Sequence, residues 1–173
     1  MKPAAIVLWL LVLVLPALAQ SQTNACLLPK ALQDRVATKY PGAKVVTESD
    51  LNEDDRQFFQ KDHHGACPGL VRVDFYGDRK PTFALELITR NEAGPKTKVV
   101  VARQIGGHWN FVLVAELSEE APVIWSDKPG DYEGVWGDKL HASHSVIVWQ
   151  GYESWAVLYA WNGRKIEHIQ LVD

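Results

Sequence analysis

Hydrophobic and polar positions change their period once along the chain, near residue 70. Before that point the apolar residues follow a helical spacing. In the segment 28–39, Leu28, Leu32 and Val36 recur every fourth residue and fall on one helical face. Pro29 suits a first helical turn, and the Tyr40-Pro41-Gly42 sequence ends the pattern. We therefore predict an amphipathic helix over 28–39.

A second short helix is predicted to begin within 49–53. Asp50 can cap its first turn, where the helix dipole favours the acidic residues that follow. Phe58 and Phe59 would then form its buried face. The segment 43–47 between the two helices is predicted to form a short strand.

From residue 70 onward the pattern alternates with period two, as expected for half-buried strands. Gly106-Gly107 and Asn162-Gly163 each separate two such segments, a two-residue hairpin signal. The segment 116–138 reads as a long, turn-rich connection. The predicted strands are 70–75, 83–89, 98–105, 108–115, 143–149, 154–161 and 165–171. The predicted fold class is α+β, with two N-terminal helices packed on a mainly antiparallel meander sheet of six to seven strands.

The N-terminus has the features of an export signal. Lys2 precedes an apolar run over 4–15, and Ala17-Leu18-Ala19 offers small residues at the positions that signal peptidase reads. The prediction is a signal peptide at 1–19, cleaved after Ala19, and a single α+β domain at 20–173 that is periplasmic or secreted. The alternative is an uncleaved membrane anchor, which the shortness of the run disfavours. A permanent membrane anchor is not expected.

Composition narrows the class of partner. The chain carries a net charge of −3 and has no basic cluster, so nucleic acid is not an expected partner. Its two cysteines, Cys26 and Cys67, favour one disulfide in an oxidising compartment, because redox or metal motifs need closer spacing. No cofactor is expected, since neither a phosphate-binding glycine loop nor a nucleophile motif occurs.

Two stretches carry a family resemblance. The first is Cys67-Pro68-Gly69 followed by Asp74-Phe75-Tyr76-Gly77-Asp78, and the second is Tyr152-Glu153-Ser154-Trp155-Ala156-Val157-Leu158-Tyr159 with Trp161-Asn162-Gly163. Together they resemble an uncharacterised family of small exported bacterial proteins. That resemblance implies export and no particular activity.

The segment 74–82 also looks like the calcium loop of FG-GAP and VCBS repeats. Asp74 stands at the first ligand position and Asp78 at the fifth, but Tyr76 replaces the third ligand and Arg79 stands where the pattern has glycine. Calcium needs six to eight oxygen ligands. We therefore interpret the loop as a structural turn in which aspartate side chains accept backbone N–H bonds.

This interpretation predicts that neither calcium nor a chelator changes the melting temperature of the protein, because two of the usual ligands are missing. Differential scanning fluorimetry with calcium and with EDTA measures this directly. A melting temperature that rises with calcium and falls with chelator would show that the loop binds the ion.

Two histidine clusters are candidate chemical sites. Asp138, His141 and His144 have the spacing of a zinc site if the segment is helical, but a strand would turn the two histidines to opposite faces. Asp62, His63 and His64 could supply an acid–base group near neutral pH, or they are simply exposed in a loop.

Tryptophan is concentrated in the second half of the chain. The rings either fill the core or form an exposed strip that binds a sugar or a protein. Trp125, Tyr132 and Trp136 are the candidate binding residues, because they lie in the turn-rich connection. The leading hypothesis is an exported binding module for a protein or glycan partner of the cell envelope. The alternatives are a hydrolase of envelope material using a His/Asp site and a structural envelope component.

Overall fold

The computed structural model describes residues 25–92, 94–118, 121–152 and 154–172, so the predicted signal peptide at 1–19 lies outside the described residues. These residues contain helices α1 (Lys30–Lys39) and α2 (Glu53–Asp62), with a short 3-10 turn at Glu48–Asp50. None of the helices in this part of the chain is long and apolar enough to cross a membrane.

Eleven strands make up the rest of the described structure. Sheet A has five strands, with β1-β3-β4-β5 as neighbours and β2 also paired with β3. Sheet B has four strands in the order β11-β10-β9-β6, and β7 and β8 form a separate two-stranded hairpin. All pairs are antiparallel. The strands are β1 (Lys44–Val45), β2 (Leu70–Val73), β3 (Thr82–Asn91), β4 (Gly94–Ile105), β5 (His108–Leu117), β6 (Val123–Asp127), β7 (Gly130–Glu133), β8 (Lys139–Ala142), β9 (Val146–Gly151), β10 (Trp155–Trp161) and β11 (Ile166–Val172).

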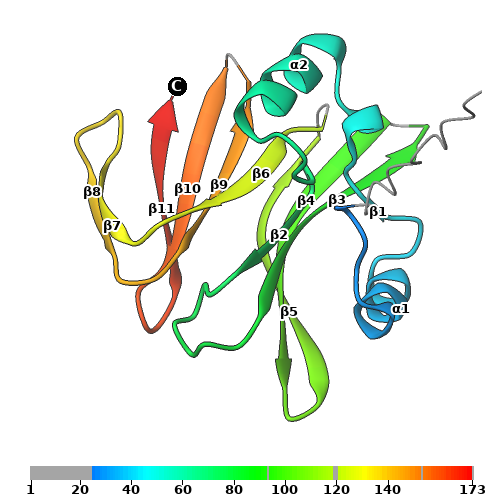
Figure 1. The fold of residues 1–173 in the computed structure, drawn as a ribbon, viewed down its shortest axis with the longest axis horizontal. Coiled ribbons are helices and arrows are strands. Elements are labelled where there is room, and N and C mark those ends of the chain that lie inside the picture. The colour runs from blue at the N-terminus through cyan, green and yellow to red at the C-terminus, as the bar shows by residue number, and fades with distance from the viewer. Residues whose placement is uncertain (1–24, 93, 119–120, 153, 173) are drawn as a thin grey trace, which may run out of the picture.

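Sheets A and B pack face to face, and the strand alternation determines which side chains meet between them. In β9, Ile147 and Trp149 point into the space between the sheets, whereas Val146 and Val148 point to the outer face of sheet B. Consecutive residues of this strand are therefore buried on both faces, since the β7–β8 hairpin covers the outer side (Figure 1).

The predicted α+β class with antiparallel sheets is confirmed, but the prediction of one meander sheet of six to seven strands is wrong. The strands divide into two stacked sheets, and the predicted connection at 116–138 contains β6 and β7. Alternation shows that a strand has two different faces, but it does not show which sheet the strand joins. The second helix begins after Asn52, whose side chain caps the Asp55 N–H at 2.9 Å, rather than after Asp50.

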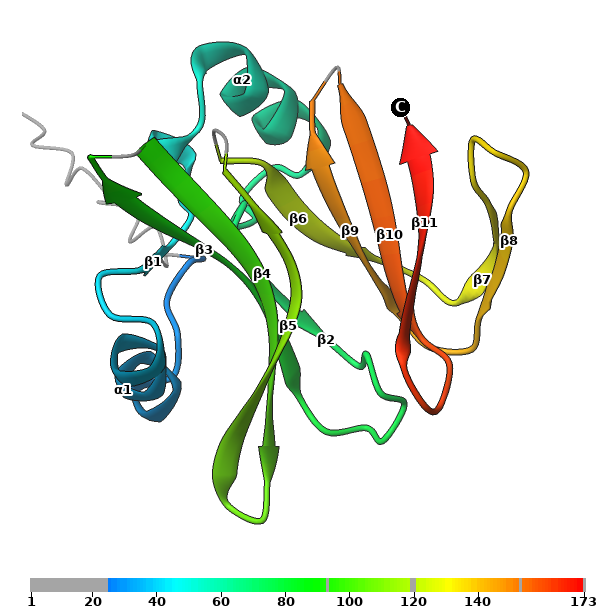
Figure 2. The same ribbon diagram turned by 180° about the vertical axis from the view of Figure 1, so that it is seen from behind.

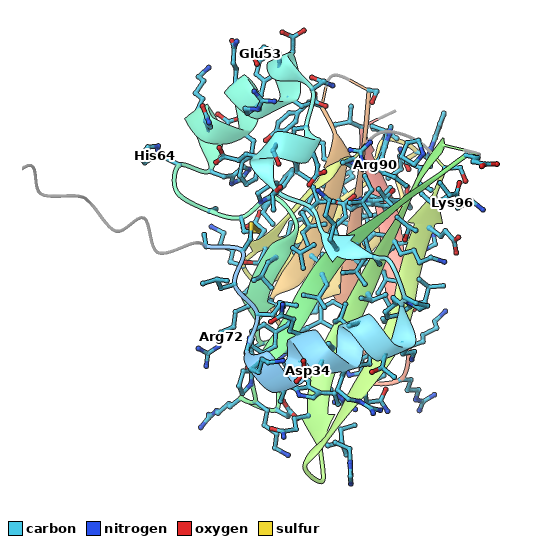
Figure 3. The ribbon with its side chains drawn as sticks, turned by 90° about the vertical axis from the view of Figure 1, so that its right-hand side faces the viewer. Asp34, Glu53, His64, Arg72, Arg90 and Lys96 are labelled. Carbon is cyan, nitrogen blue, oxygen red and sulfur yellow. A yellow bond between two sulfur atoms is a disulfide. The ribbon has the colours of Figure 1, made fainter. Side chains whose placement is uncertain are left out.

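The two helices cover different parts of the molecule instead of one shared face. α1 lies across the outer face of sheet A, where Leu32 and Val36 pack on Leu85 and Val100 (Figures 1 and 3). Burying each such side chain contributes roughly 1.5–3 kcal/mol. α2 covers one end of the molecule, where Phe59 packs with Val46 and other buried apolar side chains.

The Cys67-Pro68-Gly69 segment joins the two sheets on one side. The predicted disulfide from Cys26 to Cys67 is present, with Cα atoms 5.1 Å apart. The Pro68 carbonyl accepts a 2.8 Å hydrogen bond from the Ile124 N–H of sheet B. Gly69 lies against the Val46 backbone so closely that a Cβ atom would come within 2.5 Å of the Val46 oxygen. Only glycine permits this approach.

Glu86 is a buried carboxyl group in the middle of β3, facing the space between the sheets. The Trp149 indole N–H donates a 3.0 Å hydrogen bond to Glu86 Oε1, while Oε2 has no partner among the described atoms. Burial raises the pKa of Glu86 well above the ordinary carboxyl value, and the Trp149 hydrogen bond opposes part of that rise. The carboxyl is therefore neutral in the folded protein over a range in which an exposed glutamate is charged.

This arrangement predicts a stability that falls as the pH rises. The contribution of Glu86 to the free energy of unfolding is fully present below about pH 4. As the pH rises from there to the raised pKa of the folded protein, the free energy of unfolding falls by up to about 1.4 kcal/mol per pH unit, because the unfolded chain releases the Glu86 proton first. Glu86→Gln cannot titrate, so this slope should disappear, and the variant should exceed the wild type at the higher pH values. Urea unfolding across this range measures the slope. The exposed Glu133→Gln change is the control, and an equal slope in wild type and Glu86→Gln would contradict the prediction.

Candidate functional site

The two sheets are joined on the β2 and β6 side and stand apart on the side of β5 and β11. β5 and β11 are the terminal strands of their sheets, and no hydrogen-bonded ladder joins them among the described strands (Figures 1 and 2). A cleft of about 480 Å³ lies between them. This volume is within the range of about 300–1,000 Å³ that small-molecule sites commonly have.

Inward-facing side chains of four strands line the cleft. Cross-strand register pairs Arg103 of β4 with Asn110 of β5, and Trp161 of β10 with Ile166 of β11. One step further from the hairpin ends, Val112 continues the inward row of β5 and is 39% exposed. An apolar side chain on the inward face of a sheet is normally covered by the opposing sheet. Here that surface faces the open cleft instead. The lining consists of Tyr76, Arg103, Asn110, Val112, Leu113, Val114, Tyr159, Trp161, Arg164, Lys165, Ile166 and His168.

A stack of three side chains connects the sheets at one end of the cleft. The Arg103 guanidinium lies 3.9 Å from the centre of the Tyr76 ring, a cation–π contact. Tyr76 in turn meets Trp161 edge to face, with ring centres 5.0 Å apart. The stack links β4 to β10 through the loop between β2 and β3, and it holds the Arg103 side chain in one orientation.

The cleft has a positive electrostatic character. Arg103, Arg164 and Lys165 line it, and its lining includes no aspartate or glutamate. Burial is the main cause of the raised pKa of Tyr76. The positive charge of Arg103 lowers this pKa, and the negative charge of the nearby Asp78 raises it further. Burial raises the Tyr159 pKa to about 12, so this phenol stays protonated at neutral pH.

The three predicted binding residues are not gathered in one exposed loop. Trp125 is half-buried on β6 and Tyr132 is half-buried on β7, and both pack against the apolar cluster under the β7–β8 hairpin. The Tyr132 hydroxyl donates to the Lys128 carbonyl. Trp136 alone is strongly exposed, at 75%, in the turn between β7 and β8.

Asp62, His63 and His64 are placed at the C-terminal end of α2. Asp62 is the last helical residue, and His64 points to solvent (Figure 3). The His63 ring lies between two aromatic rings, 5.2 Å from Phe59 and 4.8 Å from Trp125, centre to centre. Burial lowers the pKa of His63, while the Asp62 charge acts in the opposite direction. The structure therefore gives His63 the contacts of a packed aromatic cluster.

Asp138, His141 and His144 do not share one strand or helix, because Asp138 precedes β8, His141 lies on β8, and His144 lies in the connection before β9. His141 Nδ1 lies 2.6 Å from Asp131 Oδ1 across the β7–β8 hairpin, and both side chains are exposed. The His144 ring packs on Gly77, where a Cβ atom would be within 2.1 Å of the ring. Within the described residues, no group of three or more His, Cys, Asp or Glu side chains could hold a metal ion.

Asp74 and Asp78 organise the loop between β2 and β3 through backbone contacts. Asp74 Oδ1 accepts from the Arg79 N–H at 3.2 Å, and Asp78 Oδ1 accepts from the Lys80 N–H at 3.0 Å. Arg79 has a φ of 59°, the left-handed conformation that the glycine of a calcium loop normally adopts. The loop therefore keeps a tight turn and directs Tyr76 into the cleft.

No protein-family model, curated protein or solved structure matches this chain. The function of the cleft is therefore argued from its own side chains. Neither Trp161 nor the cations around it were among the candidate binding residues that the sequence predicted. The available signal was the inward row of β4, which changes from Val99 and Val101 to Arg103 without leaving the inward face.

The position of His63 predicts how its pKa responds to a single substitution. Trp125→Ala removes one of the two rings that exclude water from the imidazole, so the His63 pKa should rise toward its ordinary value. NMR titration of the histidine signals measures the shift. Trp136→Ala, which removes an exposed ring, is the control and should leave the His63 pKa unchanged. An unchanged pKa in Trp125→Ala would show that this ring does not desolvate His63.

Proposed function

We propose that the protein is an exported binding module that takes a small ligand of the cell envelope into the cleft between its two sheets. The observation that carries the proposal is the inward face of β5. Val112 is directed toward the opposing sheet and yet remains 39% exposed, because the cleft of about 480 Å³ separates the strands there. Apolar surface inside a concave site is the usual basis of small-ligand binding.

Three further observations support the proposal. The Arg103–Tyr76–Trp161 stack fixes polar and aromatic groups before any ligand arrives, which lowers the ordering cost of binding. The disulfide between Cys26 and Cys67 agrees with an oxidising compartment outside the cytosol. The resemblance to small exported bacterial proteins points in the same direction.

A hydrolase is less well supported by the same geometry. His63 is held between Phe59 and Trp125 rather than opposite a nucleophile, and burial lowers its pKa. His141 has an exposed carboxylate partner at 2.6 Å but lies on an open hairpin surface. The Arg103–Trp161 end of the cleft contains cations and rings, which bind and orient molecules, and the imidazole of the lining, His168 of β11, lies beside the Tyr159 ring, 5.9 Å centre to centre.

The proposal predicts that filling the cleft abolishes binding. Val112→Trp places a bulky ring in the open space, whereas Val135→Trp places the same ring on the exposed β7–β8 turn, where Val135 is 46% exposed. We would incubate each purified protein with an envelope extract of the source cell and record bound small molecules by native mass spectrometry. Circular dichroism would verify that the variants are folded.

We expect a bound species on the wild type and on Val135→Trp, and at least about tenfold less on Val112→Trp, equivalent to about 1.4 kcal/mol of binding free energy. Equal binding by Val112→Trp would place the site elsewhere. A wild type that retains no molecule from any fraction of the extract would overturn the binding function itself.

A further inference from the structure

The cations of the cleft lie at one end of it. Arg103 reaches that end from β4, and Arg164 and Lys165 come from the turn between β10 and β11. Figures 1 and 2 both show this turn beside the loop between β2 and β3, which carries Tyr76. The contact between Tyr76 and Trp161 fixes the same neighbourhood.

Two of these cations have no carboxylate partner within the described part of the chain. Lys165 forms an ion pair with Glu167, with Nζ and Oε1 3.4 Å apart, but neither Arg103 nor Arg164 has an ion pair. Asp78 is close enough to affect the Tyr76 pKa but does not line the cleft. The positive charge of the two guanidinium groups is therefore available to a ligand.

Stacking leaves Arg103 in a good position to bind an acid group. The guanidinium carbon lies 3.9 Å from the centre of the Tyr76 ring, and a cation–π contact of this kind uses the face of the ring and leaves the N–H donors of the guanidinium available for hydrogen bonds. A planar fork of N–H donors matches the two oxygens of a carboxylate or phosphate. Asn110, paired with Arg103 across β4 and β5, adds a neutral amide at the same place.

Farther from the turn between β10 and β11, the β5 wall of the cleft is apolar. Val112 and Val114 of β5 line it there, together with Tyr159 of β10 and its register partner His168 of β11, while Ile166 stands next to the cationic end. Val112 is exposed there without a covering side chain from the opposing sheet. An apolar chain or ring placed along this surface would remove it from water, which contributes about 25 cal/mol per Å² buried.

We propose, building on the binding function proposed above, that the ligand is an anionic amphiphile. Its carboxylate or phosphate head binds Arg103 and Arg164, and its apolar body lies along Val112, Val114 and Ile166. A cationic ligand would meet three cationic side chains and no carboxylate in the lining. A neutral sugar would leave the charges of Arg103 and Arg164 without a counter-charge.

Four probes with unbranched alkyl chains of nearly equal length test the ligand class by isothermal titration calorimetry: octanoate, octyl phosphate, octan-1-ol and octyltrimethylammonium. Because the chains match closely (heptyl in octanoate, octyl in the others), the comparison isolates the head group. The test variant is the double substitution Arg103→Gln and Arg164→Gln. The matched control is Arg35→Gln with Arg72→Gln, which makes the same charge change at two exposed arginines on α1 and β2, where Figure 3 shows Arg72 pointing away from the sheets.

We expect both anions to bind with one site per chain and octan-1-ol at least about tenfold more weakly. The Arg103 and Arg164 double variant should weaken both anions by about tenfold or more, while the Arg35 and Arg72 variant should bind like the wild type. A preference for octanoate would indicate a carboxylic acid ligand, and a preference for octyl phosphate would indicate a phosphate ester.

Three outcomes would overturn the proposal. The first is octan-1-ol or octyltrimethylammonium binding as tightly as the anions. The second is the Arg103 and Arg164 variant keeping wild-type affinity, and the third is no probe binding. If the wild type still retains an extract molecule that Val112→Trp loses, only the ligand class is wrong and the cleft remains the site. If the wild type also retains no molecule from the extract, both the ligand class and the proposed binding function are wrong.

Discussion

The structure depends on the point at which its two sheets are joined. Cys67, Pro68 and Gly69 provide three successive attachments: a disulfide to Cys26, a hydrogen bond to sheet B, and a backbone contact too close for any side chain. Because this junction lies at one side of the stacked sheets, the opposite strands, β5 and β11, are free to stand apart. The cleft is therefore a consequence of joining the sheets on one side.

Between the junction and the cleft, the inward faces form a packed core. The Trp149 indole contacts the Trp155 ring, with centres 4.7 Å apart, and binds the Glu86 carboxyl. A buried carboxyl group is costly unless it is neutral and hydrogen-bonded. The single Trp149 bond gives this core a defined orientation that purely apolar side chains would not impose. The same inward row becomes polar at Arg103, where the core ends and the cleft begins.

Much of the fold follows from local pattern. Both helices, strands β2 to β5 and β9 to β11, and the Cys26–Cys67 disulfide were predictable, because periodicity, turn residues and cysteine count are properties of short segments; β6, β7 and β8 were not predicted. The division into two sheets was not, since it depends on contacts between residues distant in sequence, such as Pro68 with Ile124. For the same reason the sequence pointed to Trp125 and Trp136 as binding residues. The cleft is lined instead by Tyr76, which lies in the loop that resembles a calcium-binding loop in sequence. Its cations are ordinary surface residues in the sequence, and only the pairing of strands places them together.

The separation of junction from cleft has an evolutionary consequence. Substitutions at Gly69 or Cys67 would disturb the joining of the sheets, so descendants of this chain should keep those residues whatever they bind. Exposed side chains at the rim, such as Arg164 in the turn between β10 and β11, lie outside the packed core and can change without altering the scaffold. A lineage built on this architecture can therefore diversify its ligands by exchanging a few rim residues, while the fold itself stays constant.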